Sequence, residues 1–159
     1  MLADTLAFIV FLLVNLAAAS SGAFFRPGQW YRNLRKPAWR PPDWLFGPVW
    51  AVLYLLIAIS GWLVWRTVGD TGSGRLALSV YSAQLVLNAA WPAVFFGLRR
   101  PGWGVVEIIG LWGSILATIV AFFPLSRAAS YMLIPYLLWV SFASVLNLRV
   151  WQLNRRLQA

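Results

Sequence analysis

The chain has 159 residues, of which 61% are apolar, with four acidic and thirteen basic side chains. We expect a membrane protein rather than a soluble one, because five all-apolar helices in so short a chain would leave no polar face for water. The sequence contains no Cys and no His, which excludes disulfides, thiolate chemistry and the usual metal and haem ligands. The basic residues that give the chain a net charge of +9 lie between the apolar segments and at their ends. We therefore expect anionic membrane lipid, rather than nucleic acid, as their partner.

Five stretches of about 20 residues carry at most one charge each, and each is long enough to cross a hydrocarbon core of about 30 Å as a helix. They are residues 6–25, 44–65, 76–98, 103–123 and 130–151. We therefore predict an all-α membrane protein, a single bundle of five transmembrane helices that takes up residues 1–159. Only Asp4 is charged before the first span, so we expect this span to be retained rather than cleaved as a signal peptide.

Loop 1, residues 26–43, follows the first span and holds four Pro and five Arg or Lys. Pro fixes φ and removes a backbone donor, so we expect a long, stiff and structured loop rather than a helix. Trp30 and Trp39 offer flat apolar faces beside these cations, which suits a flat ligand with an apolar body and an anionic rim. We therefore place the function at this loop.

The later links are short, at residues 66–75, 99–102 and 124–129, and short links make neighbouring helices antiparallel. Loop 1, the third link and the C-terminus then share one side, which holds ten of the thirteen basic residues. The positive-inside tendency places that side in the cytoplasm of a bacterial cell membrane.

Polar and aromatic residues share faces on three of the predicted spans. The sets are Trp50 and Tyr54 on the second span, Tyr81, Gln84, Asn88 and Trp91 on the third, and Tyr136, Trp139, Ala143 and Asn147 on the fifth. Polar side chains are costly in hydrocarbon, so these faces should point inward. They either form hydrogen bonds between helices or line a cavity, and both interpretations stay open.

Glu107 is the one acidic residue within a span. It lies about one turn after the start of the fourth span and close in sequence to Arg99 and Arg100. We expect an interfacial carboxylate that reaches one of these cations, not a proton relay.

At these residues the sequence resembles the TspO/MBR family of tryptophan-rich sensory and translocator proteins, over nearly the whole chain. The resemblance rests on ordered short motifs in loop 1 and in the second, third and fifth spans. They are Trp30-Tyr31, Leu34-Arg35-Lys36-Pro37-Ala38-Trp39, Pro41-Pro42-Asp43-Trp44, Gly47-Pro48-Val49-Trp50, Leu53-Tyr54, Tyr81, Gln84-Leu85, Leu87-Asn88, Trp91-Pro92, Phe95-Phe96-Gly97, Pro135-Tyr136, Trp139 and Leu146-Asn147.

The resemblance implies a five-helix bundle, usually a homodimer, whose first loop closes over a pocket for porphyrins such as protoporphyrin IX or haem and for benzodiazepine-type molecules. No cofactor is required. Carried onto this chain together with the faces above, the ligand-binding residues are Tyr31, Trp39, Trp50, Tyr54, Asn88, Trp91, Tyr136, Trp139, Ala143 and Asn147, with Arg32, Arg35 and Lys36 for the anionic groups. The sterol-recognition stretch of animal members has a Tyr where this chain has Leu148, so sterol binding is not carried over.

Three functions compete for this site. We favour a porphyrin-binding membrane receptor or sensor. A transporter of the same ligands ranks second, because no inverted repeat and no midplane charge provides for alternating access. A light-dependent porphyrin-degrading enzyme ranks third: Trp50 and Trp139 would be its redox-active side chains, but the sequence offers no acid–base pair, metal site or nucleophile.

Overall fold

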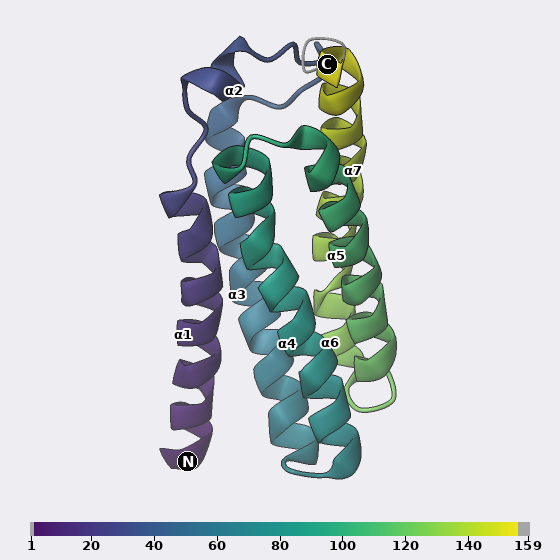
Figure 1. Ribbon diagram of the computed structural model, residues 1–159. Helices are drawn as coiled ribbons and strands as arrows, with labels where there is room; N and C mark the ends of the chain where they lie inside the picture. Colours follow the sequence, from purple (N-terminus) through teal and green to yellow (C-terminus); the bar gives the residue numbers. More distant parts are fainter. Residues whose placement is uncertain (1, 156–159) are drawn as a thin grey trace.

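The computed structural model describes residues 2–155 and is built from helices joined by short links (Figure 1). They are α1 (Leu2–Phe24), α2 (Gln29–Asn33), α3 (Asp43–Val68), α4 (Gly72–Pro92), the π-helix η1 (Ala93–Gly97), α5 (Pro101–Phe122), α6 (Arg127–Met132) and α7 (Ile134–Asn154). Five helical segments are long and apolar enough to span a membrane: α1, α3, α4 with η1, α5, and α6 with α7. The predicted all-α five-span bundle is confirmed.

The long helices form a closed ring with loop 1 across one end. Helix α1 packs against α3 and α4, α4 against α5, and α5 against α7, while α3 completes the ring mainly through α6. Loop 1 and the end of α7 lie at one end of the bundle, and the chain begins at the other (Figure 1). The predicted placement of loop 1 and the C-terminal segment on one side is therefore confirmed for the described residues, which exclude Arg156.

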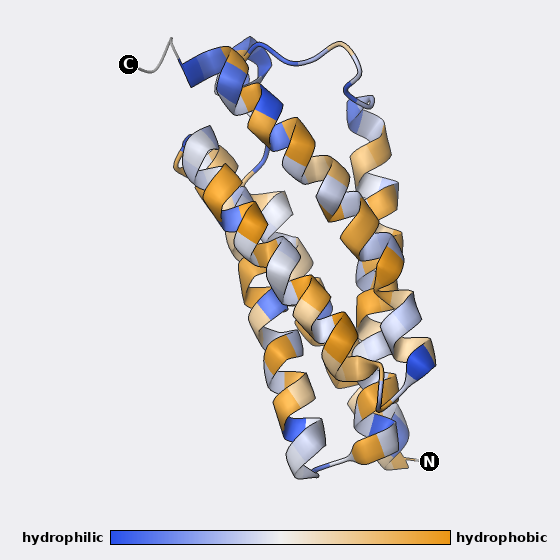
Figure 2. Ribbon diagram, turned by 90° about the vertical axis from the view of Figure 1, so that its right-hand side faces the viewer, coloured by the Kyte–Doolittle hydropathy of each residue, from blue (hydrophilic) through white to orange (hydrophobic). Residues whose placement is uncertain are grey.

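Hydrophobic residues run along the whole length of the long helices, and hydrophilic residues gather in loop 1 and at the end of α7 (Figure 2). Large apolar side chains that point outward include Leu13, Val52, Val86, Ile109 and Leu138, all more than half exposed. Such a continuous apolar surface is unfavourable in water and matches a hydrocarbon surround. The chain is thus an integral, multi-pass membrane protein.

Three helix boundaries differ from those that the sequence predicts. Loop 1 contains the single turn α2, because Pro27 and Pro37 leave room between them for five helical residues. Gly72 and Gly74 belong to α4 rather than to the preceding link, since the Gly74 amide donates to the Thr71 hydroxyl at 3.1 Å and caps the helix.

The last span also begins earlier than predicted. The Ser126 hydroxyl accepts from the Ala129 amide at 3.3 Å, which starts the short helix α6 at Arg127. Leu133 separates α6 from α7, and Pro135 lies in the first turn of the second helix. As at Thr71, a side-chain cap thus begins a helix inside a segment, here residues 124–129, that the sequence predicts to be a link.

The half of the bundle away from loop 1 is closely packed. Ile57, Val64 and Phe122 have no exposed surface. A Cβ added to Gly61 would lie 2.7 Å from Tyr81 Cζ, so only glycine allows this close approach of helix and ring. We call this half the packed half, and it provides a rigid base for the other end.

Candidate ligand-binding site

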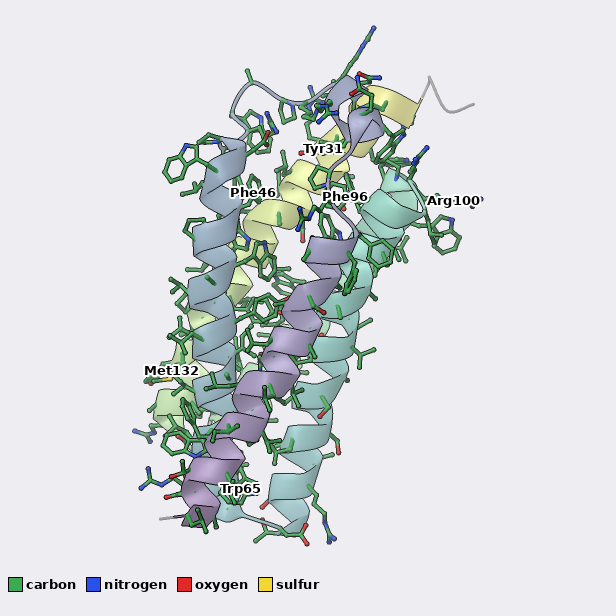
Figure 3. All side chains as sticks on the ribbon, turned by 90° about the vertical axis from the view of Figure 1, so that its left-hand side faces the viewer. Tyr31, Phe46, Trp65, Phe96, Arg100 and Met132 are labelled. Carbon is green, nitrogen blue, oxygen red and sulfur yellow. The ribbon has the colours of Figure 1, made fainter. Side chains whose placement is uncertain are left out.

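The two helices that frame the site, α3 and α7, diverge toward loop 1. Helix α3 packs closely against α6 near the packed half and only sparsely against α7. Aromatic side chains occupy the widening space: the rings of Trp50 and Tyr136 are 6.2 Å apart and those of Phe46 and Trp139 are 5.6 Å apart, both edge to face. Figure 3 shows Phe46 near this end of α3 and Trp65 at the opposite end of the bundle.

Loop 1 adds a further aromatic side chain to this set. The ring of Trp39 is 5.8 Å from that of Phe142, which in turn is 5.7 Å from that of Trp139. Trp39 is 49% exposed, so a large part of its surface has no partner within the chain. We call Trp39, Phe46, Trp50, Trp139 and Phe142 the aromatic wall.

Among the described residues, one buried polar atom in the aromatic wall lacks a partner. The indole Nε1 of Trp139 is buried and, among the described residues, makes no hydrogen bond. Leaving a buried donor unpaired costs about 1–3 kcal/mol, and native proteins rarely do so without a reason. An acceptor on a bound molecule would satisfy this N–H.

A buried chain of hydrogen bonds joins three helices beside the wall. The Tyr54 hydroxyl donates to Asn88 Oδ1 at 2.7 Å, the Asn88 amide donates to the Tyr136 hydroxyl, and that hydroxyl donates to Gln84 Oε1 at 2.9 Å. The structure thus brings together the faces that the sequence predicts on the second, third and fifth spans. Such a network fixes the floor of the site, because each member orients the next.

Trp91 and Asn147 form a separate pair at the start of α5. The Trp91 indole donates to Asn147 Oδ1 at 3.1 Å, and Asn147 Nδ2 donates to the carbonyl of Pro101 at 3.0 Å. A Cβ on Gly104 would lie 3.0 Å from the same Asn147 oxygen, so glycine allows this approach. For Asn88 and Asn147, hydrogen bonding between helices is therefore observed, whereas half-buried Ala143 packs at the edge of the core.

The π-helix η1 positions the second aromatic group of the site. Pro92 has no N–H to continue the α-helical pattern, and the Leu98 amide donates to the Ala93 carbonyl five residues back. This geometry directs Phe95 and Phe96 toward loop 1, where their ring centres are 6.2 Å and 5.3 Å from that of Tyr31. Tyr31 and Phe96 lie near each other beneath the loop (Figure 3).

The predicted anion contacts differ in availability. Lys36 Nζ lies 4.5 Å from the centre of the Tyr31 ring and donates to the carbonyls of Arg32 and Leu34. Burial lowers the pKa of the Lys36 ammonium, with a smaller effect of the cation Arg40, and burial raises the pKa of Tyr31. Arg32 and Arg35 are exposed. Because both are exposed, the two arginines are more accessible than Lys36, although Arg32 also donates to Gln29 Oε1 at 2.7 Å.

The expectation that Glu107 reaches Arg99 or Arg100 is wrong. Both carboxylate oxygens are buried and make no hydrogen bond within residues 2–155, and no ion pair there includes Glu107. The two arginines are exposed in the link before α5. Proximity in sequence did not translate into contact, because Glu107 lies on the interior side of α5 between buried Gly104 and Leu111.

Sequence reasoning missed two members of the aromatic wall and one buried amide. Phe46 precedes Trp50 by four residues and Phe142 follows Trp139 by three, so helical spacing alone could have placed both beside residues already selected. Asn154 is 2% exposed and bonds to loop 1. It lies beyond the predicted fifth span, and no local pattern marks it.

An open hollow lies at the far end of the bundle, between the end of α3 and the start of α4. It is lined by Trp65, Gly69, Asp70, Arg75, Leu78, Ser79 and Ser82. Arg75 Nε is 3.7 Å from Asp70 Oδ1, and both side chains are well exposed. The hollow is open to the surroundings and lies apart from the aromatic wall.

Comparison with known proteins connects this geometry to one family. The sequence pattern of the TspO/MBR family matches residues 8–152. The chain is 42% identical over 127 residues to the translocator protein of Homo sapiens, covering 79% of this chain and 75% of that one. It is 41% identical over 151 residues to the tryptophan-rich protein TspO of Chlorobaculum tepidum, covering 94% and 96%, and 38% identical over 151 residues to the tryptophan-rich sensory protein of Cereibacter sphaeroides, covering 95% and 93%.

Proposed function

The chain belongs to the TspO/MBR family, and on this premise we propose that it is a membrane receptor that binds a porphyrin beneath loop 1. The ligand class is a planar tetrapyrrole with acidic substituents, such as protoporphyrin IX or haem, and benzodiazepine-type molecules would compete for the same place. The observation that carries the proposal is a broad aromatic wall that contains one buried, unpaired N–H donor, Trp139 Nε1.

The aromatic wall supplies the chemistry that a flat apolar disc requires. Phe46 and Trp139, and likewise Phe142 and Trp39, meet edge to face at 5.6 Å and 5.8 Å, while Trp139 and Phe142 are tilted by 37° at 5.7 Å. The rings of the wall therefore do not stack face to face on one another, which leaves faces for a planar guest. Burial of apolar surface contributes about 25 cal/mol per Å², which makes ring contact the main source of affinity.

The exposed cations of loop 1 fit the acidic rim of such a ligand. Arg32 and Arg35 offer planar guanidinium groups that can bind a carboxylate through two parallel hydrogen bonds. An exposed ion pair contributes about 0–1 kcal/mol, so these contacts orient the ligand more than they hold it. Substitutions in the wall should therefore weaken binding more than substitutions of single cations.

A titration of protoporphyrin IX into the detergent-solubilised protein, followed by tryptophan fluorescence, tests the proposal. We expect saturable quenching that Trp39→Ala and Trp50→Ala weaken. Trp44→Phe is the matched control, because Trp44 is 72% exposed at the start of α3 and lies outside the wall. Absence of saturation, or equal affinity in all variants, would contradict a site beneath loop 1.

Two further assays distinguish binding from turnover and from transport. Under equal illumination, a receptor should bleach the pigment no faster than free tryptophan does, whereas an enzyme that uses Trp50 and Trp139 should exceed that rate. Uptake of porphyrin into proteoliposomes would reveal a transporter. We expect neither excess bleaching nor uptake.

We also propose that the protein lies in a bacterial cell membrane with loop 1 in the cytoplasm, since basic residues gather at that end. From its resemblance to the family, we further propose that it is a homodimer. The cysteine-free sequence allows single-cysteine labelling at exposed Asn33 and Ser73, which lie at opposite ends. Asn33→Cys should react with an impermeant reagent only after the cells are permeabilised, and Ser73→Cys should react in intact cells. The reverse pattern would refute the orientation, and a monomer mass in nanodiscs would refute the dimer.

A further inference from the structure

The buried amide of Asn154 connects the end of α7 to loop 1. The backbone N–H of Arg35 donates to Asn154 Oδ1 at 3.0 Å, and Asn154 Nδ2 donates to the Arg35 carbonyl at 2.9 Å. The same Nδ2 also donates to the Val150 carbonyl at 2.7 Å, which anchors the amide on its own helix. Asn154 is 2% exposed although it is the last residue of α7.

This pairing satisfies both backbone polar groups of a single loop residue. An adjacent β-strand would normally provide such a donor and acceptor, and here one side-chain amide provides both. Within residues 2–155, no other hydrogen bond joins loop 1 to α4, α5 or α7. The remaining attachment consists of apolar contacts, namely ring contacts such as those of Trp39 with Phe142 and of Tyr31 with Phe96, and the packing of Leu34 against the cluster of Phe95, Leu146 and Val150.

The pairing lies at a point of loop 1 where it can control the positions of two side chains of the site. Arg35 precedes Lys36, whose ammonium lies over Tyr31, and it precedes Trp39, which joins the aromatic wall. Fixing the backbone at residue 35 therefore restricts where both of these side chains can lie. Because the bond uses only the backbone of Arg35, its guanidinium remains free for an anionic group.

We propose that Asn154 is a latch that holds loop 1 over the aromatic wall, and that breaking its two bonds to Arg35 is the step that opens the site. Asn154 is a positioning residue, since it acts through the loop rather than by touching the ligand. The inference rests on the proposed function only for what the loop covers. The latch itself is present in the ligand-free chain and is tested there.

Hydrogen exchange of the ligand-free protein in nanodiscs tests the latch directly. In Asn154→Ala we expect amide exchange across residues 34–40 to rise at least about tenfold, because two partly buried hydrogen bonds are lost. Exchange in α5, and in α7 before Val150, should stay as in the wild type. Unchanged loop exchange would overturn the latch, and an equal rise along the whole of α7 would assign Asn154 a purely structural role.

Two matched controls test whether the effect is specific. One asks whether the side chain of Arg35 matters in addition to its backbone, and the other asks whether loss of a different amide near the end of α7 has the same effect. Arg35→Ala keeps both backbone groups and should leave loop exchange unchanged. Gln152→Ala removes an exposed amide near the end of α7 whose one hydrogen bond within residues 2–155 is with Arg149, and it should also leave the loop unchanged. Faster loop exchange in either control would contradict the assignment.

Arg35→Pro reaches the latch from the loop side in case the Asn154 variant does not fold. Proline removes the N–H that donates to Asn154, and Leu34 already has ψ 143, which a following proline requires. We expect faster loop exchange in Arg35→Pro alone, and unchanged exchange would contradict the latch. Where Asn154→Ala folds, adding it to Arg35→Pro should change loop exchange little further, because both substitutions break one interaction. Fully additive effects would contradict a shared latch.

Ligand kinetics then connect the latch to the site. With protoporphyrin IX, Asn154→Ala should raise the association and dissociation rates by at least about fivefold each, so that Kd changes less than either rate. A change in the dissociation rate alone would contradict gating by the loop. If no porphyrin binds, the proposed function fails while the exchange data still decide the latch; if loop exchange is unaltered, the latch fails even where porphyrin binds.

Discussion

The packed half and the space between α3 and α7 near loop 1 are filled by different means. In the packed half, small residues let helices and rings approach closely, and Gly61 lies against Tyr81 and Phe11 with no room for a methyl group. Between α3 and α7 near loop 1, large rings fill the space, and the pairs that join the two helices, Phe46 with Trp139 and Trp50 with Tyr136, meet edge to face. Trp39 retains exposed surface, and Trp139 retains an unpaired donor.

The difference separates stability from recognition. Close packing gives little room for adjustment, so the packed half fixes the geometry of the helices. Rings that touch edge to face can be parted by a flat guest without breaking a dense core. Substitutions should accordingly affect folding at one end and ligand binding at the other.

The largest effect should come from overpacking the packed half. Gly61→Val places new carbon atoms within about 3 Å of the Tyr81 ring and should destabilise the protein by about 3 kcal/mol, the upper end of the usual cost of overpacking. Gly113→Val is the control, because no atom lies within 4 Å of a Cβ at that position. Thermal unfolding in detergent measures both, and equal melting temperatures would contradict the tight contact at Gly61.

Removal of a wall ring should reduce affinity with little loss of stability. Trp139→Ala should weaken protoporphyrin binding at least about tenfold, because it removes both a flat face and the unpaired N–H. Trp139→Phe keeps most of the ring and should lose only the part due to the N–H, about two- to tenfold. Equal affinity in the Phe variant and the wild type would rule out a role for the Trp139 donor.

A substitution in the polar floor should affect both properties moderately. Tyr136→Phe leaves the Asn88 donor and the Gln84 acceptor unpaired in a buried place, with an expected loss of about 1–2 kcal/mol in stability. Tyr54→Phe removes only the hydrogen bond that the Tyr54 hydroxyl donates to Asn88 Oδ1 at 2.7 Å, and should lower the stability about half as much. Unfolding in detergent would contradict the network if the Tyr54 variant were the less stable of the two.

The smallest effect should come from a single loop cation. Arg32→Gln should weaken protoporphyrin binding about threefold or less at low salt, because exposed charge pairs are weak and screened. The difference from the wild type should vanish near 1 M salt, where the Debye length falls to about 3 Å. A large loss that persists at high salt would indicate that Arg32 is buried against the ligand.

Hydropathy and spacing predict the bundle well because each span must be apolar along its whole length. The shared faces of Asn88, Tyr136 and Tyr54 follow from the helical repeat, and their hydrogen bonds confirm that these residues meet. The partner of Glu107 could not be predicted, since closeness in sequence does not say which way a side chain turns.

The latch and the π-helix before α5 depend on tertiary contact rather than on local pattern. Asn154 lies 119 residues from the backbone group that it binds. The π-helix η1 needs both Pro92 and the packing of Phe95 against Trp91, whose ring centres are 5.0 Å apart. Single-sequence patterns carry the proline but not the packing partner.

A structure of the protein in nanodiscs with protoporphyrin IX bound would test the central claim most directly. We expect the pigment to lie against Trp39, Trp50 and Trp139, covered by loop 1, with its carboxylates near Arg32 or Arg35. Pigment density in the far hollow beside Trp65 and Arg75, or a loop 1 end that stays closed and empty at saturating pigment, would contradict the account.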